Sequence, residues 1–278
     1  VLGVLKGSRG QGLGWSETGY GNIVTAFQGA YALGMLLMGR LMDALGTRRG
    51  LLLAVLGWSV AAMSHALAGS AAAFSAARFA LGLSEAGLFP GAVKTVSEWF
   101  PKKERALAIG IFNSGTNVGA ILCPLVVPVV AAAWGFRAAF LVTGLLGLGW
   151  LAAWMFWYRA PSEQPRLGEA ERAHIQSDRE QHLLPAPPTG TLFRLRETWA
   201  IAGAKFLTDP VWWLYLFWIP DFLQKRHGLQ LLQVGAPLVV IYLLSDAGSV
   251  LGGYVSSALL ERGVSVNRAR KLTLLGAA

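Results

Sequence analysis

The stretch Gly39-Arg40-Leu41-Met42-Asp43-Ala44-Leu45-Gly46-Thr47-Arg48-Arg49 decides how this chain is organised. Residues 18–39 before it and residues 50–77 after it contain no Asp, Glu, Lys or Arg. A membrane helix needs roughly 20 mostly apolar residues, so the short charged stretch is predicted to be a turn between two membrane helices. Within it we expect Gly39 to allow close helix approach, Asp43 to cap a helix and Gly46 to permit the turn.

The composition of the whole chain supports an integral membrane protein. Of 278 residues, 54% are apolar and only 14% are charged, whereas a soluble domain has about a quarter of its residues charged. The apolar content, the frequent Gly and Pro and the single Cys, Cys123, exclude a disordered chain, a coiled coil and a disulfide scaffold. The net charge of +9 indicates no nucleic-acid partner, because the basic residues fall between apolar runs.

The apolar runs predict an all-α membrane bundle with seven complete crossings and the beginning of an eighth. We expect residues 1–158 to form a helical bundle, residues 159–198 a cytoplasmic linker, and residues 199–278 the start of a second bundle. Because the first crossing enters from outside, we also expect a further helix before residue 1. The expected crossings are residues 18–39, 50–66, 72–93, 106–134, 138–158, 199–222 and 230–260, with a turn at Trp134-Gly135 and a last helix from about Leu272.

The distribution of Lys and Arg predicts the orientation of the helices. Residues 40–50, 94–105, 159–198 and 261–271 together carry 17 of them, and the alternate connections carry 5. Cytoplasmic loops of membrane proteins are enriched in Lys and Arg. The four basic segments are therefore predicted to be cytoplasmic.

Several motifs resemble known transporters. The pattern Gly-x-x-x-Asp-x-x-Gly-x-Arg-Arg at residues 39–49 resembles the signature loop of the major facilitator superfamily. Residues 78–91, 97–105 and 112–115 resemble its anion:cation symporter branch, which includes permeases for hexuronates, aldonates, glucarate and phthalate. Residues 209–220 and 248–253 look most like the hexuronate type. The resemblance implies twelve helices, of which this chain holds helices two to eight and the start of the ninth, as an internal part of a larger protein.

Two ionisable residues lie within the expected third crossing. Arg78 and Glu85 are seven residues apart, so they share one helix face about 10 Å apart along the axis. Charged groups at membrane depth are costly and mark a transport pathway by default. The resemblance implies that Glu85 is the proton-coupling residue and that Arg78 tunes it. The alternative is a structural ion pair that holds two helices together.

Other residues are candidates for substrate binding. The resemblance places Tyr31 against the substrate, and Asn113, Ser114, Thr116 and Asn117 offer groups suited to a polyhydroxylated ligand, although Gly115-x-x-x-Gly119 indicates a packing role instead. Asp246 and Trp213 are candidates to line the cavity from the second half. For Asp246, a structural role is given the same weight as a role in lining the cavity. Lys205 and Asp209 are expected to neutralise each other. Two roles are open for the aromatic side chains of residues 212–218, namely contact with lipid and stacking on the substrate. These residues are Trp212, Trp213, Tyr215 and Trp218.

These patterns predict a transporter and no enzyme. The four His residues have no metal-ligand spacing, and the glycines at 10–14 form no phosphate-binding loop, so no cofactor is expected. The proton is expected to act as the coupling ion. We expect a monomeric multi-pass protein of the bacterial inner membrane, in contact with lipid, that carries sugar acids such as hexuronates or aldonates with protons by alternating access. The alternatives are a permease for phthalate-like or tartrate-like carboxylates and a non-transporting sensor.

The signature loop is expected to act as a gate on the cytoplasmic side. Gly39, Asp43, Gly46, Arg48 and Arg49 form it, far from a site at the membrane centre. Glu98 and Arg105, in the next cytoplasmic connection, are expected to be its partners.

Overall fold

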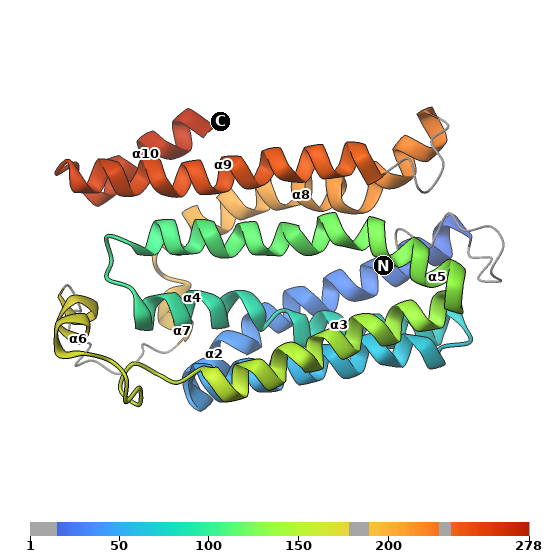
Figure 1. Ribbon diagram of the computed structural model, residues 1–278. Helices are drawn as coiled ribbons and strands as arrows, with labels where there is room; N and C mark the ends of the chain where they lie inside the picture. Colours follow the sequence, from blue (N-terminus) through green and yellow to red (C-terminus); the bar gives the residue numbers. More distant parts are fainter. Residues whose placement is uncertain (1–15, 178–188, 228–234, 278) are drawn as a thin grey trace.

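The computed structural model describes residues 16–177, 189–227 and 235–277, and every regular element in these ranges is a helix (Figure 1). This confirms the all-α prediction for the described residues. The long helices lie roughly parallel or antiparallel in one bundle (Figure 1). The elements are α2 (Glu17–Ser64), η1 (His65–Leu67), α3 (Ala71–Glu85), α4 (Leu88–Trp99), α5 (Arg105–Trp157), α6 (Glu169–Gln176), α7 (Thr189–Leu192), α8 (Arg196–His227), α9 (Gly235–Glu261) and α10 (Val266–Ala277).

Helices α2 and α5 each contain a sharp reversal at a glycine. The apolar run Thr18–Leu67 has 50 residues, which as one straight helix would be roughly 75 Å long against a hydrocarbon core of about 30 Å. The chain turns back at Gly46, with φ +75°, and at Gly135, with φ +81°. Both angles lie in the left-handed region that glycine adopts without a Cβ clash. The expected turns are confirmed, although the turn at Gly46 is tighter than the loop expected over residues 40–50.

Two further runs besides Thr18–Leu67 are long and apolar enough to cross a membrane, Ile121–Trp157 and Pro237–Glu261. Counting the reversals, and taking α3 with α4 as one pass, the described residues make seven long passes and begin another in α10. This agrees with the expected number of crossings.

The pass made by α3 and α4 is interrupted directly after Glu85. Ala86 and Gly87 separate the two helices, which together extend from residue 71 to residue 99. The pass is longer than the expected crossing, so Lys94 and Glu98 lie on a helix and not in a loop. A Cβ on Gly87 would lie 2.7 Å from the Cβ of Ala54, which places this break tightly against α2.

A buried aromatic and aliphatic cluster holds α2, α3 and α5 together near the turns at η1 and Gly135. Tyr20, Ile23, Phe74, Val127 and Phe140 are each at most 5% exposed. Burying such side chains contributes about 1.5–3 kcal/mol each in a soluble protein. In a bilayer, close van der Waals packing of this kind contributes a larger share of the free energy of helix association.

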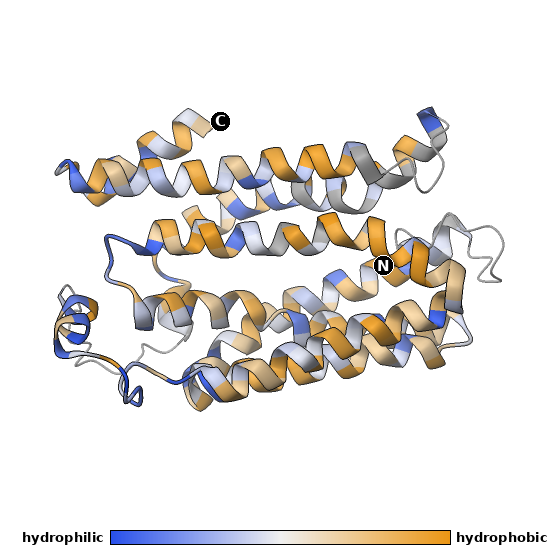
Figure 2. Ribbon diagram, viewed as in Figure 1, coloured by the Kyte–Doolittle hydropathy of each residue, from blue (hydrophilic) through white to orange (hydrophobic). Residues whose placement is uncertain are grey.

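The four Lys- and Arg-rich segments lie at the same end of the bundle. The turn at Gly46, residues 100–104, α6 with α7, and the turn between α9 and α10 are all at the left in Figure 1. Figure 2 shows hydrophilic residues gathered at this end and hydrophobic residues along most of the helix lengths. The arrangement is the one that alternating crossings with basic cytoplasmic connections require.

We predict opposite stability effects for two glycine substitutions in the first bundle of helices. A Cβ on Gly82 would overlap the carbonyl oxygen of Phe27, whereas a Cβ on Gly39 would meet no described atom within 4 Å. Gly82→Ala should lower the free energy of unfolding by about 1–3 kcal/mol, and Gly39→Ala should leave it unchanged or raise it by up to about 1 kcal/mol. Thermal unfolding in detergent measures both, and equal melting temperatures would contradict the packing assigned to Gly82. The open surroundings of Gly39 also show that its expected role in close helix approach is wrong for the described residues.

Candidate functional site

Arg78 and Glu85 both lie on α3, midway through the bundle. Each is half-buried, and Glu85 is the last residue of α3, halfway along the pass from residue 71 to residue 99. They do not form an ion pair within 4 Å in the described part of the chain, although each lies within electrostatic range of the other. The structure therefore does not show the direct structural ion pair that was the alternative role for these residues.

The Arg78 side chain is held by an aromatic ring. Its Cζ atom lies 5.7 Å from the ring centroid of Phe27, within the range of a cation–π contact. Its buried Nε atom has no hydrogen-bond partner among the described residues. A guanidinium at this depth without a carboxylate contact leaves its charge available to an anion.

Three aromatic side chains, Phe27, Tyr31 and Trp213, form what we call the aromatic cluster. Phe27 and Tyr31 are one turn apart on α2, and their ring centroids are 5.9 Å apart. Trp213 of α8 lies 5.8 Å from Tyr31 and 6.4 Å from Phe27, nearly perpendicular to both. The cluster therefore joins α8 to α2 beside Arg78.

Tyr31 also lies within electrostatic range of carboxylates from two parts of the chain. These are Glu85 of α3 and Asp209 of α8. Asp209 is paired with Lys205 at 2.9 Å, as the sequence predicted. The structure thus gathers Tyr31, Arg78, Glu85 and Trp213, all four of which the sequence analysis named, into one region.

The other candidate substrate residues lie on α5 and α9. Asn113 and Ser114 are half-buried, and the Ser114 hydroxyl donates to the carbonyl of Ile111 at 2.8 Å, within its own helix. Asp246 is half-buried on α9. The side chains of Thr116 and Asn117 lie outside the described residues.

Close packing between α5 and α9 occurs at glycines that the sequence analysis did not select. A Cβ on Gly110 would lie 3.1 Å from the carbonyl oxygen of Ser249, and one on Gly253 would lie 2.9 Å from that of Ala106. The Ser257 hydroxyl donates to the carbonyl of Lys103 at 3.3 Å. The sequence did contain an indication of this contact. The small residues Ser249, Gly253 and Ser257 recur every four residues and so lie on one face of α9.

The glycines expected to pack closely have open surroundings instead. Cβ atoms on Gly115 and Gly119 would meet no described atom within 4 Å. The packing role predicted for Gly115-x-x-x-Gly119 is therefore wrong for the part of the chain that the structure describes. A spacing of four residues identifies a face, but it does not say which face meets another helix.

Asp43 of the signature loop pairs with Lys94. The Asp43 Oδ1 and Lys94 Nζ atoms are 2.7 Å apart, and Lys94 also donates to the carbonyl of Met42 at 3.1 Å. Asp43 lies inside the first pass of α2 and does not cap a helix, so that expectation is wrong. The physical reason is that the helix continues up to Gly46, so Asp43 lies three residues before the reversal, inside a helix, where it pairs with Lys94 of α4.

Arg48 joins the loop to the end of α5. One guanidinium nitrogen of Arg48 donates to the carbonyl of Met155 at 2.9 Å, and the Trp154 indole donates to the carbonyl of Arg48 at 3.2 Å. Arg49 is exposed. Of the two residues expected to be partners of the loop, Glu98 contacts it through the Thr47 hydroxyl and not through Asp43 or Arg48. Arg105 contacts neither Asp43 nor Arg48 in the described structure.

Glu98 instead connects three helices at this end of the bundle. Its carboxylate accepts hydrogen bonds from the Thr47 hydroxyl at 2.6 Å and from the Tyr158 hydroxyl at 2.9 Å. The Tyr158 phenol is the donor in this bond, because an ionised carboxylate can only accept. Arg105 donates to the carbonyls of Phe100 and Ser97.

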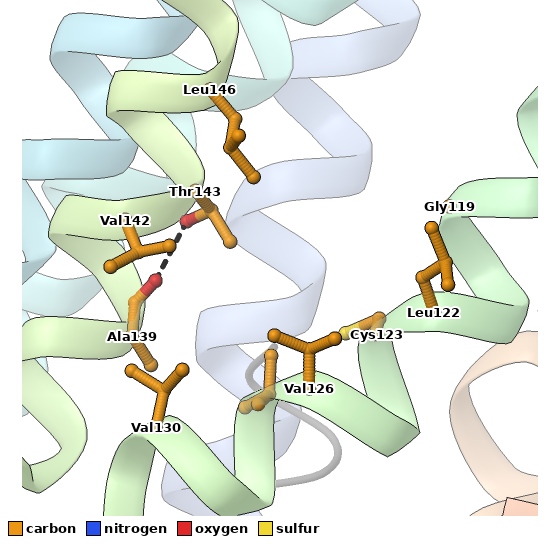
Figure 3. A pocket seen from close by; sticks show the side chains of 10 residues that line it. Gly119, Leu122, Cys123, Val126, Val130, Ala139, Val142, Thr143 and Leu146 are labelled. Atoms are coloured by element: carbon orange, nitrogen blue, oxygen red, sulfur yellow. Dashed lines mark hydrogen bonds between the residues drawn. The ribbon is translucent and has the colours of Figure 1, made fainter.

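Two cavities lie elsewhere and have apolar walls. One of about 280 Å³ lies between the two passes of α5 beside Cys123 and Val130, and its Thr143 hydroxyl already donates to the carbonyl of Ala139 at 3.0 Å (Figure 3). The other, of about 450 Å³, lies among α2, α4 and α5 beside Trp58 and Trp154. No charged side chain lines either cavity, so neither suits an organic anion. Within the described residues, no three His, Cys, Asp or Glu side chains come together as a metal site.

Comparison with known proteins places the chain among membrane transporters. It is 35% identical over 265 residues to the galacturonate transporter of Dickeya chrysanthemi, covering 93% of this chain and 76% of that protein. It is 35% identical over 252 residues to the hexuronate transporter of Escherichia coli (strain K12), and 29% identical over 266 residues to the probable L-galactonate transporter of the same strain. These matches cover 89% and 95% of this chain and 58% of each relative.

The fold is also found in a solved structure. A bacterial homologue of the human lysosomal transporter Spinster, in an inward-facing and occupied conformation, matches with a TM-score of 0.64 at 20% identity, covering 92% of this chain and 57% of that one. The chain thus spans about three-fifths of several of the proteins that it resembles. The sequence matches the Major Facilitator Superfamily over residues 1–278, and the chain belongs to this family of multi-pass membrane transporters.

Proposed function

We propose that the complete protein is a secondary transporter that carries sugar acids together with protons by alternating access. The observation that carries this proposal is Arg78, a cation deep in the bundle without an ion pair among the described residues. Moving an anion out of water is costly unless fixed positive charge meets it. Two relatives that are 35% identical to this chain are named for galacturonate and hexuronate, which are sugar acids.

Glu85 is proposed as the proton-coupling group. It is the only carboxylate within the α3–α4 pass before residue 98, and it lies midway along that pass beside Arg78. A carboxyl group that alternates between a closed interior and an open cavity can take up a proton on one side and release it on the other.

The movement in this proposal takes place between the α2–α5 helices and the α8–α10 helices. They meet through backbone-close contacts between α5 and α9 and through the aromatic cluster. Alternating access rocks one group of helices against the other around a site between them. The site proposed here lies at such a junction.

The proposal is tested by uptake of labelled galacturonate into membrane vesicles that contain the complete protein. We expect accumulation that depends on an inward proton gradient and is lost when an ionophore collapses it. Galactose, which lacks the carboxylate, should not compete. Equal uptake of galactose, phthalate-driven inhibition stronger than that by galacturonate, or accumulation unaffected by the ionophore would each overturn the assignment.

Asp43→Asn is expected to lower the maximal transport rate several-fold and to change the KM for substrate less than twofold. The Asp43–Lys94 pair lies at the end of the bundle, far from Arg78. Its loss should therefore change how readily the transporter closes at this end, and should leave the affinity of the substrate site nearly unchanged. The Asp43 side chain is 69% exposed, so the stability should fall by less than about 1 kcal/mol. Initial rates over a range of substrate concentrations separate these effects, with Arg172→Gln at an exposed position of α6, outside the loop, as the control. A large rise in KM at an unchanged maximal rate would rule out the gating role.

A further inference from the structure

Four large apolar side chains are exposed in the segment that leads into α8. Leu192 ends α7, Phe193 and Leu195 follow it, and Trp199 lies in the first turn of α8. Their exposed fractions are 39%, 55%, 44% and 63%, in that order. A group of exposed apolar side chains next to polar residues is typical of a surface that contacts a membrane or another protein.

This segment is folded into a compact turn. The Leu195 amide donates to the carbonyl of Leu192 at 3.1 Å. The Trp199 indole donates to the carbonyl of Phe193 at 2.9 Å, and the centroids of these two rings are 6.5 Å apart. The turn therefore presents the two rings side by side. Because the indole N–H already has an acceptor, its ring can enter an apolar layer without leaving a donor unsatisfied.

Arginine side chains alternate with these apolar residues. Arg194 and Arg196 are both exposed, and the acidic residue beside them is Glu197. Glu197 lies in the first turn of α8, where the positive end of the helix dipole offsets its charge. The surface around the two rings is therefore positively charged, which is complementary to phosphate groups.

The segment lies at the boundary of the membrane. The pass made by α8 follows it directly, and Phe206 and Leu207 within that pass are 78% and 73% exposed. In Figure 1, α7 lies near the end of α4, whereas α6 lies farther out along the axis of the bundle. This end of α4, at Trp99, directly precedes the basic connection at residues 100–104. Tryptophan and basic residues are enriched at this depth in membrane proteins, beside the lipid headgroups.

We propose that residues 192–199 dock on anionic phospholipids of the leaflet at the basic end of the bundle. The rings of Phe193 and Trp199 lie among the upper parts of the acyl chains. Arg194 and Arg196 extend their apolar stems along this layer and place their guanidinium groups on lipid phosphates. The contact holds the beginning of α8 at a fixed depth in the membrane. It uses no residue of the candidate transport site, so it is independent of the proposed function.

The test measures the depth of a nitroxide spin label in the complete protein, after replacement of Cys123 and any other cysteine. The label is attached at Leu195→Cys, with Glu171→Cys on exposed α6 as the aqueous reference and Leu207→Cys within α8 as the hydrocarbon reference. Oxygen concentrates in lipid and a charged nickel complex stays in water, so the ratio of their collision rates with the label reports its depth. The protein is measured in nanodiscs of phosphatidylcholine alone and of phosphatidylcholine mixed with phosphatidylglycerol.

In the mixed nanodiscs we expect the Leu195 label to be shielded from the nickel complex and open to oxygen, as the Leu207 label is. Arg194→Gln combined with Arg196→Gln should raise its collision rate with nickel by roughly fivefold or more, because each arginine near an anionic surface favours the docked state by about that factor. Phosphatidylcholine alone should have a similar effect. Arg194→Lys combined with Arg196→Lys keeps both charges and should retain most of the shielding. Arg172→Gln on α6 is the matched control and should change nothing.

Three results would overturn the proposal. The first is a Leu195 label as open to the nickel complex as the Glu171 label. The second is a label shielded from both nickel and oxygen, because another part of the protein would then cover the segment. The third is shielding that is the same with and without phosphatidylglycerol and in the double glutamine variant. Leu192→Cys reports from the other side of the turn, and the same three results there would overturn the proposal if Leu195→Cys itself disturbs the segment.

Discussion

Glu85→Gln is expected to reduce proton-driven accumulation of substrate by at least about 100-fold while leaving exchange of substrate across the membrane largely intact. Glutamine has nearly the same shape as glutamate, so the packing at the end of α3 is retained. The amide cannot take up or release a proton, and removing a positioned acid–base group typically costs 10²-fold or more. Accumulation driven by a proton gradient and counterflow of labelled substrate in the same vesicles measure the two activities separately.

Two control variants sharpen this prediction. Glu85→Asp keeps a carboxyl group and should retain part of the accumulation. Glu171→Gln makes the same chemical change at an exposed position on α6 and should have no effect. Wild-type accumulation in Glu85→Gln would exclude Glu85 as the coupling residue, and loss of counterflow together with accumulation would indicate damage to binding instead.

Arg78→Ala is expected to raise the KM for sugar acids by about 30-fold or more. Removing one partner of a buried charge pair costs about 2–5 kcal/mol, because the other charge is then desolvated without compensation. Arg78→Lys should recover part of the affinity, because an ammonium keeps the charge but lacks the planar fork of a guanidinium. Uptake kinetics of the three proteins measure this, with Arg172→Ala at an exposed position of α6 as the control.

The effect on stability distinguishes this interpretation from a structural one. A cation that only holds the bundle together would, when removed, lower the melting temperature in detergent and reduce the maximal rate and the affinity together. For Arg78, whose guanidinium lies over the Phe27 ring, we expect the affinity to fall far more than the stability. Unchanged affinity for the acid in Arg78→Ala would contradict the assignment.

Much of the fold could be predicted from the amino-acid sequence. Apolar runs indicate the passes, because each must span a hydrocarbon core of about 30 Å. The reversals at Gly46 and Gly135 were predictable, because both positions require a backbone conformation that glycine adopts readily. The shared face of Arg78 and Glu85 follows from the helical repeat alone.

The packing of the glycines was harder to predict from the chain. Gly39, Gly82, Gly115 and Gly253 all lie within helices, yet among these four only Gly82 and Gly253 lie against another backbone. Whether a small residue meets a neighbour depends on the rotation of its helix about its own axis. In a membrane helix that rotation is poorly marked by hydropathy, because lipid and protein interior are both apolar.

What the sequence by itself determined is the set of helices, their turns, the end of the bundle that carries the basic segments, and the residues with ionisable groups at depth. Only the tertiary structure decided which of those residues meet. It paired Asp43 with Lys94, 51 residues away, joined Glu98 to Thr47 and Tyr158, and brought Trp213 of α8 to Tyr31 of α2. The periodicity of one helix defines its own faces, but contacts between helices also depend on depth, tilt and rotation, which arise when all the helices pack together.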